Sequence, residues 1–292
     1  MRMLRLLLLL ATVVSTVLCL GSVARAQDSR EITWLAMEFP PFFIQEGDQA
    51  DRGIADEVTR ILQENMPEWR HREEVANTAQ IVVRLRAGER VCSAAYIRTP
   101  QRERFMEFSI PDLVLPPNGI TIRRADVGRF GGGEPVSLAT LLDDPSFRLG
   151  VAQGRSYGKE IDAIIERHKQ DRHVYSRLGE DIYATLFDML VRRGVDYIVG
   201  YPYEASFHAR RRGKEGEIVS LPVRENPEMI LAHVVCPKTD WGRQAITDID
   251  EVLRRVRPTP EYRDLVERWL DPELRQAYRD AYETELGLPA TE

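Results

Sequence analysis

The sequence is poor in the residues that bind metals and form redox motifs. It has three cysteines and five histidines in 292 residues, with no CxxC or HExxH motif, and the histidines are scattered along the chain. A metal site needs several such ligands at a characteristic spacing, so we expect neither a metal nor another cofactor. The net charge is −6, and no strongly basic segment favours a nucleic-acid partner.

Long apolar runs are confined to the N-terminus. Arg2 and Arg5 precede an apolar run over residues 6–20, and Ala24-Arg25-Ala26 follows it. The run is shorter than the ~20 residues of a spanning helix and ends at an A-x-A site, which is typical of a secretory signal peptide. We therefore predict cleavage after Ala26 and a periplasmic mature protein. An uncleaved anchor is the alternative.

Removal of this signal leaves two cysteines, Cys92 and Cys236. An exported protein meets an oxidising environment, in which a cysteine pair tends to form a disulfide. We predict one disulfide between them. Two buried free thiols are the alternative.

Apolar runs of strand length alternate with apolar stripes of helical spacing. The strand-like runs are 32–37, 91–97, 148–151, 195–200 and 229–235, and the helical stripes cover 54–62, 182–190 and 246–256. Two further helices are expected after Pro258 and Pro272. This alternation predicts an α/β architecture with mostly parallel sheets.

Five short motifs follow one another in a recognisable order. They are Pro40-Pro41-Phe42 with Gly53, Thr99-Pro-Gln-Arg102 with Phe108-Ser109-x-Pro111, Leu149-Gly-Val-Ala-Gln-Gly154, Arg193-Gly-Val-Asp196, and a C-terminal helix ending near Trp269. Each motif is weak by itself. In this order and spacing they resemble the family 3 extracellular solute-binding proteins, the polar-amino-acid type of periplasmic binding protein, over nearly all of the mature chain.

The resemblance implies a two-lobed periplasmic-binding-protein type 2 fold, with mixed sheets flanked by helices and a ligand cleft between the lobes. After the signal peptide at 1–26, lobe 1 would comprise 27–118 and 225–292, and lobe 2 would comprise 119–224. The chain would cross between lobes near 115–120 and 223–228, where prolines separate consecutive strands. Cys92 and Cys236 then fall in one lobe, on strands that such folds place close together.

The resemblance also implies the ligand contacts. The arginine of the T-x-x-R segment, here Arg102, would hold a carboxylate through its planar fork, with Arg98 as a second donor. Pairing of Arg102 with Glu107 is the alternative. Lobe 2 would offer free N–H groups at a helix start, from Gly154, Arg155 and Ser156. An ordinary strand-to-helix turn is the alternative there. Phe42, Ile97 and Tyr201 complete the expected cleft.

One position departs from the family pattern. Tyr201 stands where amino-acid binders usually carry an acid for the ligand's ammonium, and tyrosine brings no negative charge. An ordinary α-amino acid is therefore in doubt as the ligand. Glu204 could substitute, or it could serve the dipole of the following helix.

The resulting function prediction is a monomeric solute-binding protein that captures a small, amino-acid-like carboxylate between its lobes for ABC-type uptake or sensing, with a membrane permease or sensor as partner. One alternative is an enzyme on the same scaffold, with Glu38 or Glu204 as a general acid. A scaffold that binds a partner but no ligand is the other. The sequence shows no nucleophile and base at a suggestive spacing, so we predict a binding protein, not an enzyme.

Overall fold

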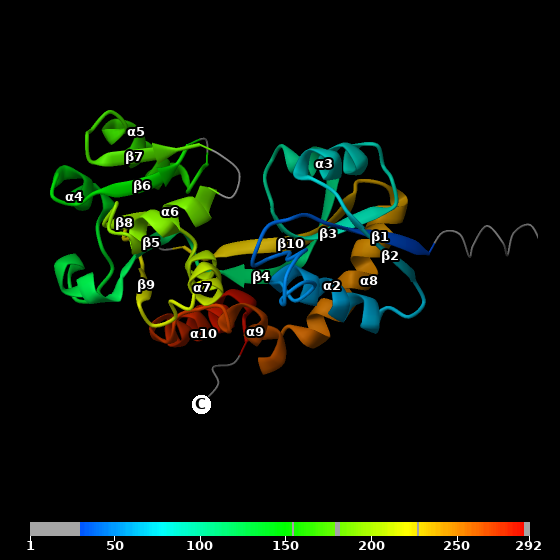
Figure 1. Cartoon of the computed structure of the whole chain (residues 1–292). Helices are drawn as coiled ribbons and strands as arrows, with labels where there is room; N and C mark the ends of the chain where they lie inside the picture. Colours follow the sequence, from blue (N-terminus) through cyan, green and yellow to red (C-terminus); the bar gives the residue numbers. More distant parts are fainter. Residues whose placement is uncertain (1–29, 154, 179–181, 227, 289–292) are drawn as a thin grey trace, which may run out of the picture.

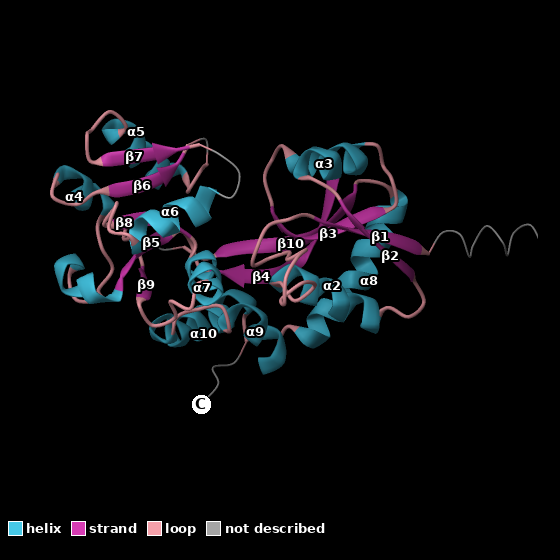
Figure 2. Cartoon of the chain, in the orientation of Figure 1, coloured by secondary structure: helices cyan, strands magenta, loops and turns pink. Residues whose placement is uncertain are grey.

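The computed structural model describes residues 30–153, 155–178, 182–226 and 228–288. The predicted signal peptide and Gly154 lie outside these ranges. The described chain forms two α/β lobes side by side, each with its own five-stranded sheet (Figures 1 and 2). Within these ranges no helix is long and apolar enough to cross a membrane.

Lobe 1 combines the two ends of the described chain. Its strand order is β2 (Arg70–Val75), β1 (Glu31–Ala36), β3 (Val91–Ile97), β10 (Ile230–Pro237) and β4 (Met106–Leu115). Only β10 runs against the other strands of this sheet. Its helices are α2 (Ile54–Asn65), α3 (Thr78–Arg86), α8 (Asp240–Val256), α9 (Pro260–Glu267) and α10 (Pro272–Leu286), with a short 3-10 turn, η1 (Arg102–Arg104).

Lobe 2 is formed by the middle of the chain. Its strand order is β7 (Val174–Arg177), β6 (Leu149–Ala152), β8 (Tyr197–Gly200), β5 (Gly119–Arg123) and β9 (Ile218–Leu221). Here β5 is the strand that runs against its neighbours. The helical elements are η2 (Arg124–Phe130), α4 (Leu138–Asp143), α5 (Lys159–His168), α6 (Ile182–Val191) and α7 (Pro202–Arg211).

Two short segments join the lobes. The chain passes from β4 to β5 through residues 116–118 and returns from β9 to β10 through residues 222–229. In each sheet the antiparallel strand is the first one after a crossing, so both sheets are mixed. The predicted lobe boundaries at 118/119 and 224/225 lie on these segments.

Each lobe has its own apolar core, but α7 contacts both. Most buried side chains of lobe 2 form one cluster, whereas Tyr203 and Phe207 of α7 pack into the lobe 1 core. The rings of Phe207 and Trp269 lie 6.0 Å apart. Helix α7 therefore fills the junction between the lobes, beside the two crossings.

The predicted disulfide is present and lies within lobe 1. Cys92 in β3 and Cys236 in β10 are joined, with their Cα atoms 4.4 Å apart. The two cysteines are next to Ser93 and Val235, which are register partners in the antiparallel ladder. The bond ties the returning strand β10 to the part of lobe 1 that precedes the first crossing.

Candidate functional site

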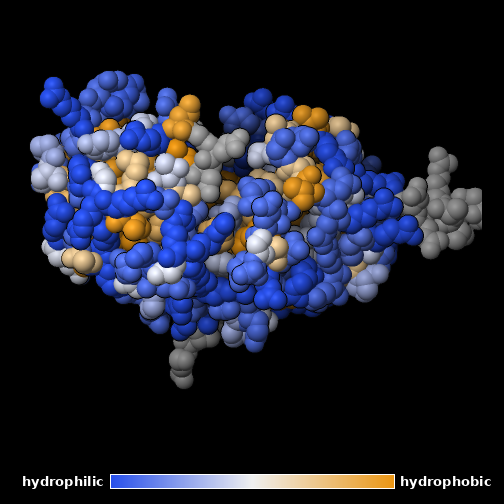
Figure 3. Space-filling model, in the orientation of Figure 1, coloured by the Kyte–Doolittle hydropathy of each residue, from blue (hydrophilic) through white to orange (hydrophobic). Residues whose placement is uncertain are grey.

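The predicted site segments lie where strands end at the junction of the lobes. Strands β6 and β7 point toward lobe 1, and β4 points toward lobe 2 (Figure 1). The molecular surface is hollowed between the lobes on the face shown, with hydrophobic atoms on both sides (Figure 3). In α/β sheets, ligands bind outside the carboxyl ends of the strands, so this hollow is the candidate site.

On the lobe 1 side, the Pro-Pro-Phe loop is fixed to the start of α2. One carboxylate oxygen of Asp56 accepts the N–H groups of Ile44 and Gly53, each at 3.0 Å. Gly53 is required for this approach, because a Cβ there would lie 2.3 Å from the carbonyl oxygen of Phe42. Burial, partly offset by these two hydrogen bonds, raises the pKa of Asp56 to about 6. The loop is thus held rigidly at the junction.

In this loop the Phe39 side chain is more exposed to solvent than that of Phe42. Phe42 is only 4 % exposed, whereas Phe39, stacked on it with ring centres 5.5 Å apart, is 39 % exposed. The exposed ring offers an apolar face at the carboxyl end of β1. Sequence reasoning selected Phe42 and missed Phe39, although Phe39 directly precedes the double proline.

The arginines after β3 lie against aromatic rings. The guanidinium of Arg98 lies 5.0 Å from the centre of the Phe108 ring, and that of Arg102 lies 5.2 Å from the centre of Tyr96. Arg102 also donates to the backbone oxygen of Ile97 at 2.7 Å. Ile97 itself is 41 % exposed. The ligand roles of Arg98, Arg102 and Ile97 stay predictions.

On the lobe 2 side, Arg155 is surrounded by tyrosines and bound to Glu204. Its two terminal nitrogens donate to the two oxygens of Glu204, at 2.9 and 2.6 Å. Its guanidinium lies 5.3, 5.8 and 5.4 Å from the ring centres of Tyr157, Tyr183 and Tyr201, which we call the tyrosine cage. Burial alone would lower the pKa of Arg155, but the Glu204 carboxylate outweighs it and raises the pKa.

Glu204 is committed at both oxygens. It is 3 % exposed, and besides Arg155 it accepts the N–H of Tyr201 at 3.1 Å, at the start of α7. Of the two roles considered for Glu204, the helix-start role is therefore present. The other, a vacant anion for a ligand's ammonium, is not, because Arg155 already occupies that carboxylate.

One N–H group at the start of α5 is bonded within the chain. The hydroxyl of Ser156 and the N–H of Tyr157 both donate to Asp162. A carboxylate from the first turn of the helix thus satisfies the Tyr157 N–H, as acidic residues near helix N-termini commonly do. The sequence signal for this was Asp162, one turn into the helix. The ligand roles expected of the Arg155 and Ser156 N–H groups stay predictions.

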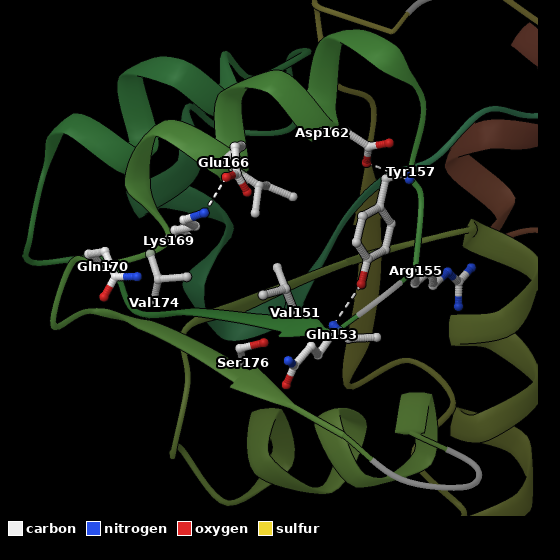
Figure 4. A pocket seen from close by; sticks show the side chains of 12 residues that line it. Val151, Gln153, Arg155, Tyr157, Asp162, Glu166, Lys169, Gln170, Val174 and Ser176 are labelled. Atoms are coloured by element: carbon white, nitrogen blue, oxygen red, sulfur yellow. Dashed lines mark hydrogen bonds and ion pairs between the residues drawn. The ribbon is translucent and has the colours of Figure 1, made fainter.

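A pocket of about 470 Å³ lies beside this loop, between α5 and strands β6 and β7 (Figure 4). Its lining includes Gln153, Ser176, Glu166 and Lys169, the last two joined as an ion pair. Arg155 and Tyr157 also line this pocket, and the Arg155 guanidinium lies beside the Tyr157 ring (Figure 4).

A column of aromatic rings connects the two sides of the site. The Phe42 ring meets Tyr203 edge-on with centres 5.1 Å apart, and Tyr203 stacks on Tyr201 at 4.9 Å. The guanidinium of Arg155 in turn lies over the Tyr201 ring, 5.4 Å from its centre. The column runs from lobe 1, through α7, to the tyrosine cage of lobe 2.

The crossing segments hold the Arg155 loop as well. The side-chain amide of Asn118, in the first crossing, donates to the backbone oxygen of Tyr157 at 3.1 Å. Asn226, in the second crossing, donates to the backbone oxygen of Asn118 at 3.4 Å. The loop that carries Arg155 is therefore bonded to the first crossing, which is itself bonded to the second.

Comparison with known proteins gives structural relatives only. No family model matches the sequence, and no curated protein sequence matches it. An ancestral cationic amino-acid solute-binding protein superposes with a TM-score of 0.65 at 16 % identity, covering 86 % of this chain and 100 % of that one. Substrate-binding domain 2 of Lactococcus lactis GlnP, in an open conformation, gives 0.62 at 14 %, covering 82 % and 95 %. A histidine kinase sensor domain with similarity to periplasmic binding proteins gives 0.55 at 18 %, covering 82 % and 97 %.

This chain matches each of these relatives over 95–100 % of the relative's own length. At such identities the likeness establishes the fold and leaves the ligand open. The chain has the two-lobed fold of the type 2 periplasmic binding proteins, as the motif order predicted.

Proposed function

We propose that this protein is an exported solute-binding protein that captures a small carboxylate-bearing solute between its lobes, for uptake by a membrane permease or for sensing. The observation that carries the proposal is that two arginines and one exposed apolar ring follow the carboxyl ends of lobe 1 strands, beside a second lobe joined by two short crossings. Arg98 and Arg102 supply the cations from lobe 1. Phe39 supplies an apolar wall.

The fold gives such a ligand a way to act on conformation. Each crossing is short, eight residues at the longer one, and each is a suitable hinge. A solute that contacts both lobes stabilises only the closed arrangement, so its binding shifts the equilibrium toward closure. Closure is the event that a permease or a sensor would read.

Binding without catalysis agrees with the geometry of the two candidate acids. Both oxygens of Glu204 are engaged by Arg155, so it presents no proton to a substrate. Glu38 accepts the N–H of Gln45 at 3.0 Å within its own loop. Neither acid stands beside a nucleophile in the part of the chain that the structure describes.

A thermal-shift screen of residues 27–292 tests the proposal. Small carboxylates, amino acids and amines are compared, since a ligand that binds only the folded protein raises its Tm. With the strongest carboxylate, Arg102→Ala should weaken binding by roughly 2–5 kcal/mol, and Arg102→Lys should restore only part of it. Arg104→Ala, on the same segment but exposed, is the matched control and should bind normally. Unchanged affinity in a folded Arg102→Ala protein would contradict the assignment.

A further inference from the structure

The Arg155 site has the composition of a binding site for an organic cation. A buried carboxylate lies at one side, and three tyrosine rings lie within 5.3–5.8 Å of the guanidinium carbon. Such rings attract a cation through their negative faces, and an anion beside them adds direct charge pairing. In this chain the cation is not a solute but the side chain of Arg155.

The internal cation is well fixed. Its side chain is 20 % exposed, against 4 % for Glu204. The two-pronged pair with Glu204 uses both terminal nitrogens of the guanidinium. The loop on either side is held as well, by Asn118 at the Tyr157 backbone and by Asp162 at the Tyr157 N–H. An incoming ammonium would have to displace a paired guanidinium from a site already complementary to it.

We infer that Arg155 is a built-in occupant of the cation site formed by Glu204 and the tyrosine cage, so that the cleft selects carboxylates that carry no ammonium group. This inference rests on the proposed function and specifies its ligand class: an acid with an aromatic or aliphatic body. With Glu204 neutralised, an α-ammonium entering the cleft loses its water and finds no anion at this site.

Exposed hydrophobic side chains offer a surface for the apolar part of such an acid. Among the described residues, five large hydrophobic side chains are exposed, and four of them lie at or just beyond the carboxyl ends of β1, β2, β3 and β7. These four are Phe39, Val75, Ile97 and Leu178. Ile97 adjoins the predicted carboxylate donors Arg98 and Arg102, Phe39 lies in the loop after β1, and Leu178 belongs to lobe 2. An apolar solute would cover this surface, which is otherwise open to water.

Matched ligand pairs test the selection. Calorimetry compares 3-phenylpropanoate with phenylalanine, and 4-methylpentanoate with leucine, on residues 27–292. Each deaminated acid should bind more tightly than its amino acid, by roughly tenfold or more, because the ammonium is desolvated without an anionic partner. Equal or tighter binding of the amino acids would overturn the inference and leave the proposed function standing. If neither series binds, the ligand class inferred here fails, whereas the proposed function is decided by the thermal-shift screen of carboxylates, amino acids and amines.

Emptying the cage gives an independent readout. Arg155→Ala should create a cation site, so millimolar methylguanidinium should raise the Tm of this variant and leave the wild type unchanged, with sodium chloride as the salt control. The double variant Arg155→Ala/Glu204→Gln removes the anion too and should not respond. No response from a folded Arg155→Ala protein would overturn the inference. If that variant folds neither with nor without methylguanidinium, the cage does not recognise a free cation, and this too counts against it.

Discussion

Asp112 in β4 is a buried carboxyl group whose ionisation should set the pH dependence of stability. It is 1 % exposed, and one of its oxygens accepts the N–H of Ala95 at 3.0 Å. Ala95 has a φ of +64°, so its N–H leaves the regular ladder near the bulge between His233 and Val235. The other carboxylate oxygen has no hydrogen-bond partner among the described residues. Burial is the main reason that the pKa of Asp112 rises to about 7.

The direction in which stability changes with pH follows from which state binds more protons. The unfolded chain has a carboxyl pKa near the reference value of 3.8, whereas the folded protein keeps its proton up to about pH 7. The folded state therefore binds more protons between these values, and its stability falls as pH rises through this window. From pH 5 to pH 8 the loss is about 2–3 kcal/mol, and the full difference of about three pKa units corresponds to roughly 4 kcal/mol.

Asp112→Asn should remove this dependence. The amide oxygen can still accept the Ala95 N–H, and no charge has to be buried. Denaturant unfolding at pH 5 and pH 8 should show the variant gaining about 2–3 kcal/mol on the wild type between the two conditions. Asp56 titrates in both proteins, so its contribution cancels in the difference.

Asp112→Ala separates charge from hydrogen bonding. It also lacks the pH dependence, but it leaves the Ala95 N–H unpaired and should be less stable than Asp112→Asn by about 1–3 kcal/mol at both pH values. A difference between the wild type and Asp112→Asn that does not change from pH 5 to pH 8 would refute the reasoning. It would mean that Asp112 is already ionised in the folded protein at pH 5.

Three further changes test other parts of the structure. The Cys92–Cys236 disulfide closes a loop of 144 residues, so its reduction should lower the free energy of unfolding by up to about 5 kcal/mol. Two free thiols in the denatured, unreduced protein would show that the bond does not form. Arg123 is buried in lobe 2 and donates to two aspartates and two carbonyl oxygens. Arg123→Met should therefore lower the free energy of unfolding by about 3–5 kcal/mol. A loss near zero in denaturant unfolding would show that this network does not stabilise the protein. Gly200→Ala would place a Cβ 2.1 Å from the Tyr183 ring and should lower the free energy of unfolding by about 1–3 kcal/mol. Gly128→Ala, with open space around it, should leave stability unchanged. Equal Tm values for the two variants would contradict this.

The strands that the sequence predicted are the apolar ones in the middle of each sheet. Strands β1, β3, β6, β8 and β10 all appear within two residues of their predicted bounds at most ends. Strand β2, Arg70–Val75, was not recognised, because its sequence Arg-His-Arg-Glu-Glu-Val has no alternation of apolar residues. It is an edge strand that pairs with β1, so its formation depends on a neighbour far along the chain.

The sequence predicted which loops form the candidate site but not the pairings of their side chains. That the site lies at the loops after β1, β3, β6 and β8 stays a prediction of the motif order. The motif order could not reveal that Arg155 pairs with Glu204, because 49 residues separate them and only the juxtaposition of β6 and β8 brings them together. Asp162 was closer in sequence, yet its capping role depends on the path of the loop before α5. The sequence shows which charged residues a motif contains, but the residues that pair with them are known only once the fold is known.

The way the Arg155 loop is anchored constrains how the two lobes can act on each other. Asn118 joins the first crossing to this loop, Asn226 joins the second crossing to Asn118, and Tyr203 packs on Phe42 of lobe 1. A rotation about the crossings would therefore leave the cage almost fixed relative to the hinge. The largest displacements would occur farther from the crossings. Leu178 of lobe 2 and Phe39 and Ile97 of lobe 1 are exposed. A solute held near the hinge by charge and covered by these exposed residues would engage both lobes, and only such a solute can shift the equilibrium toward closure.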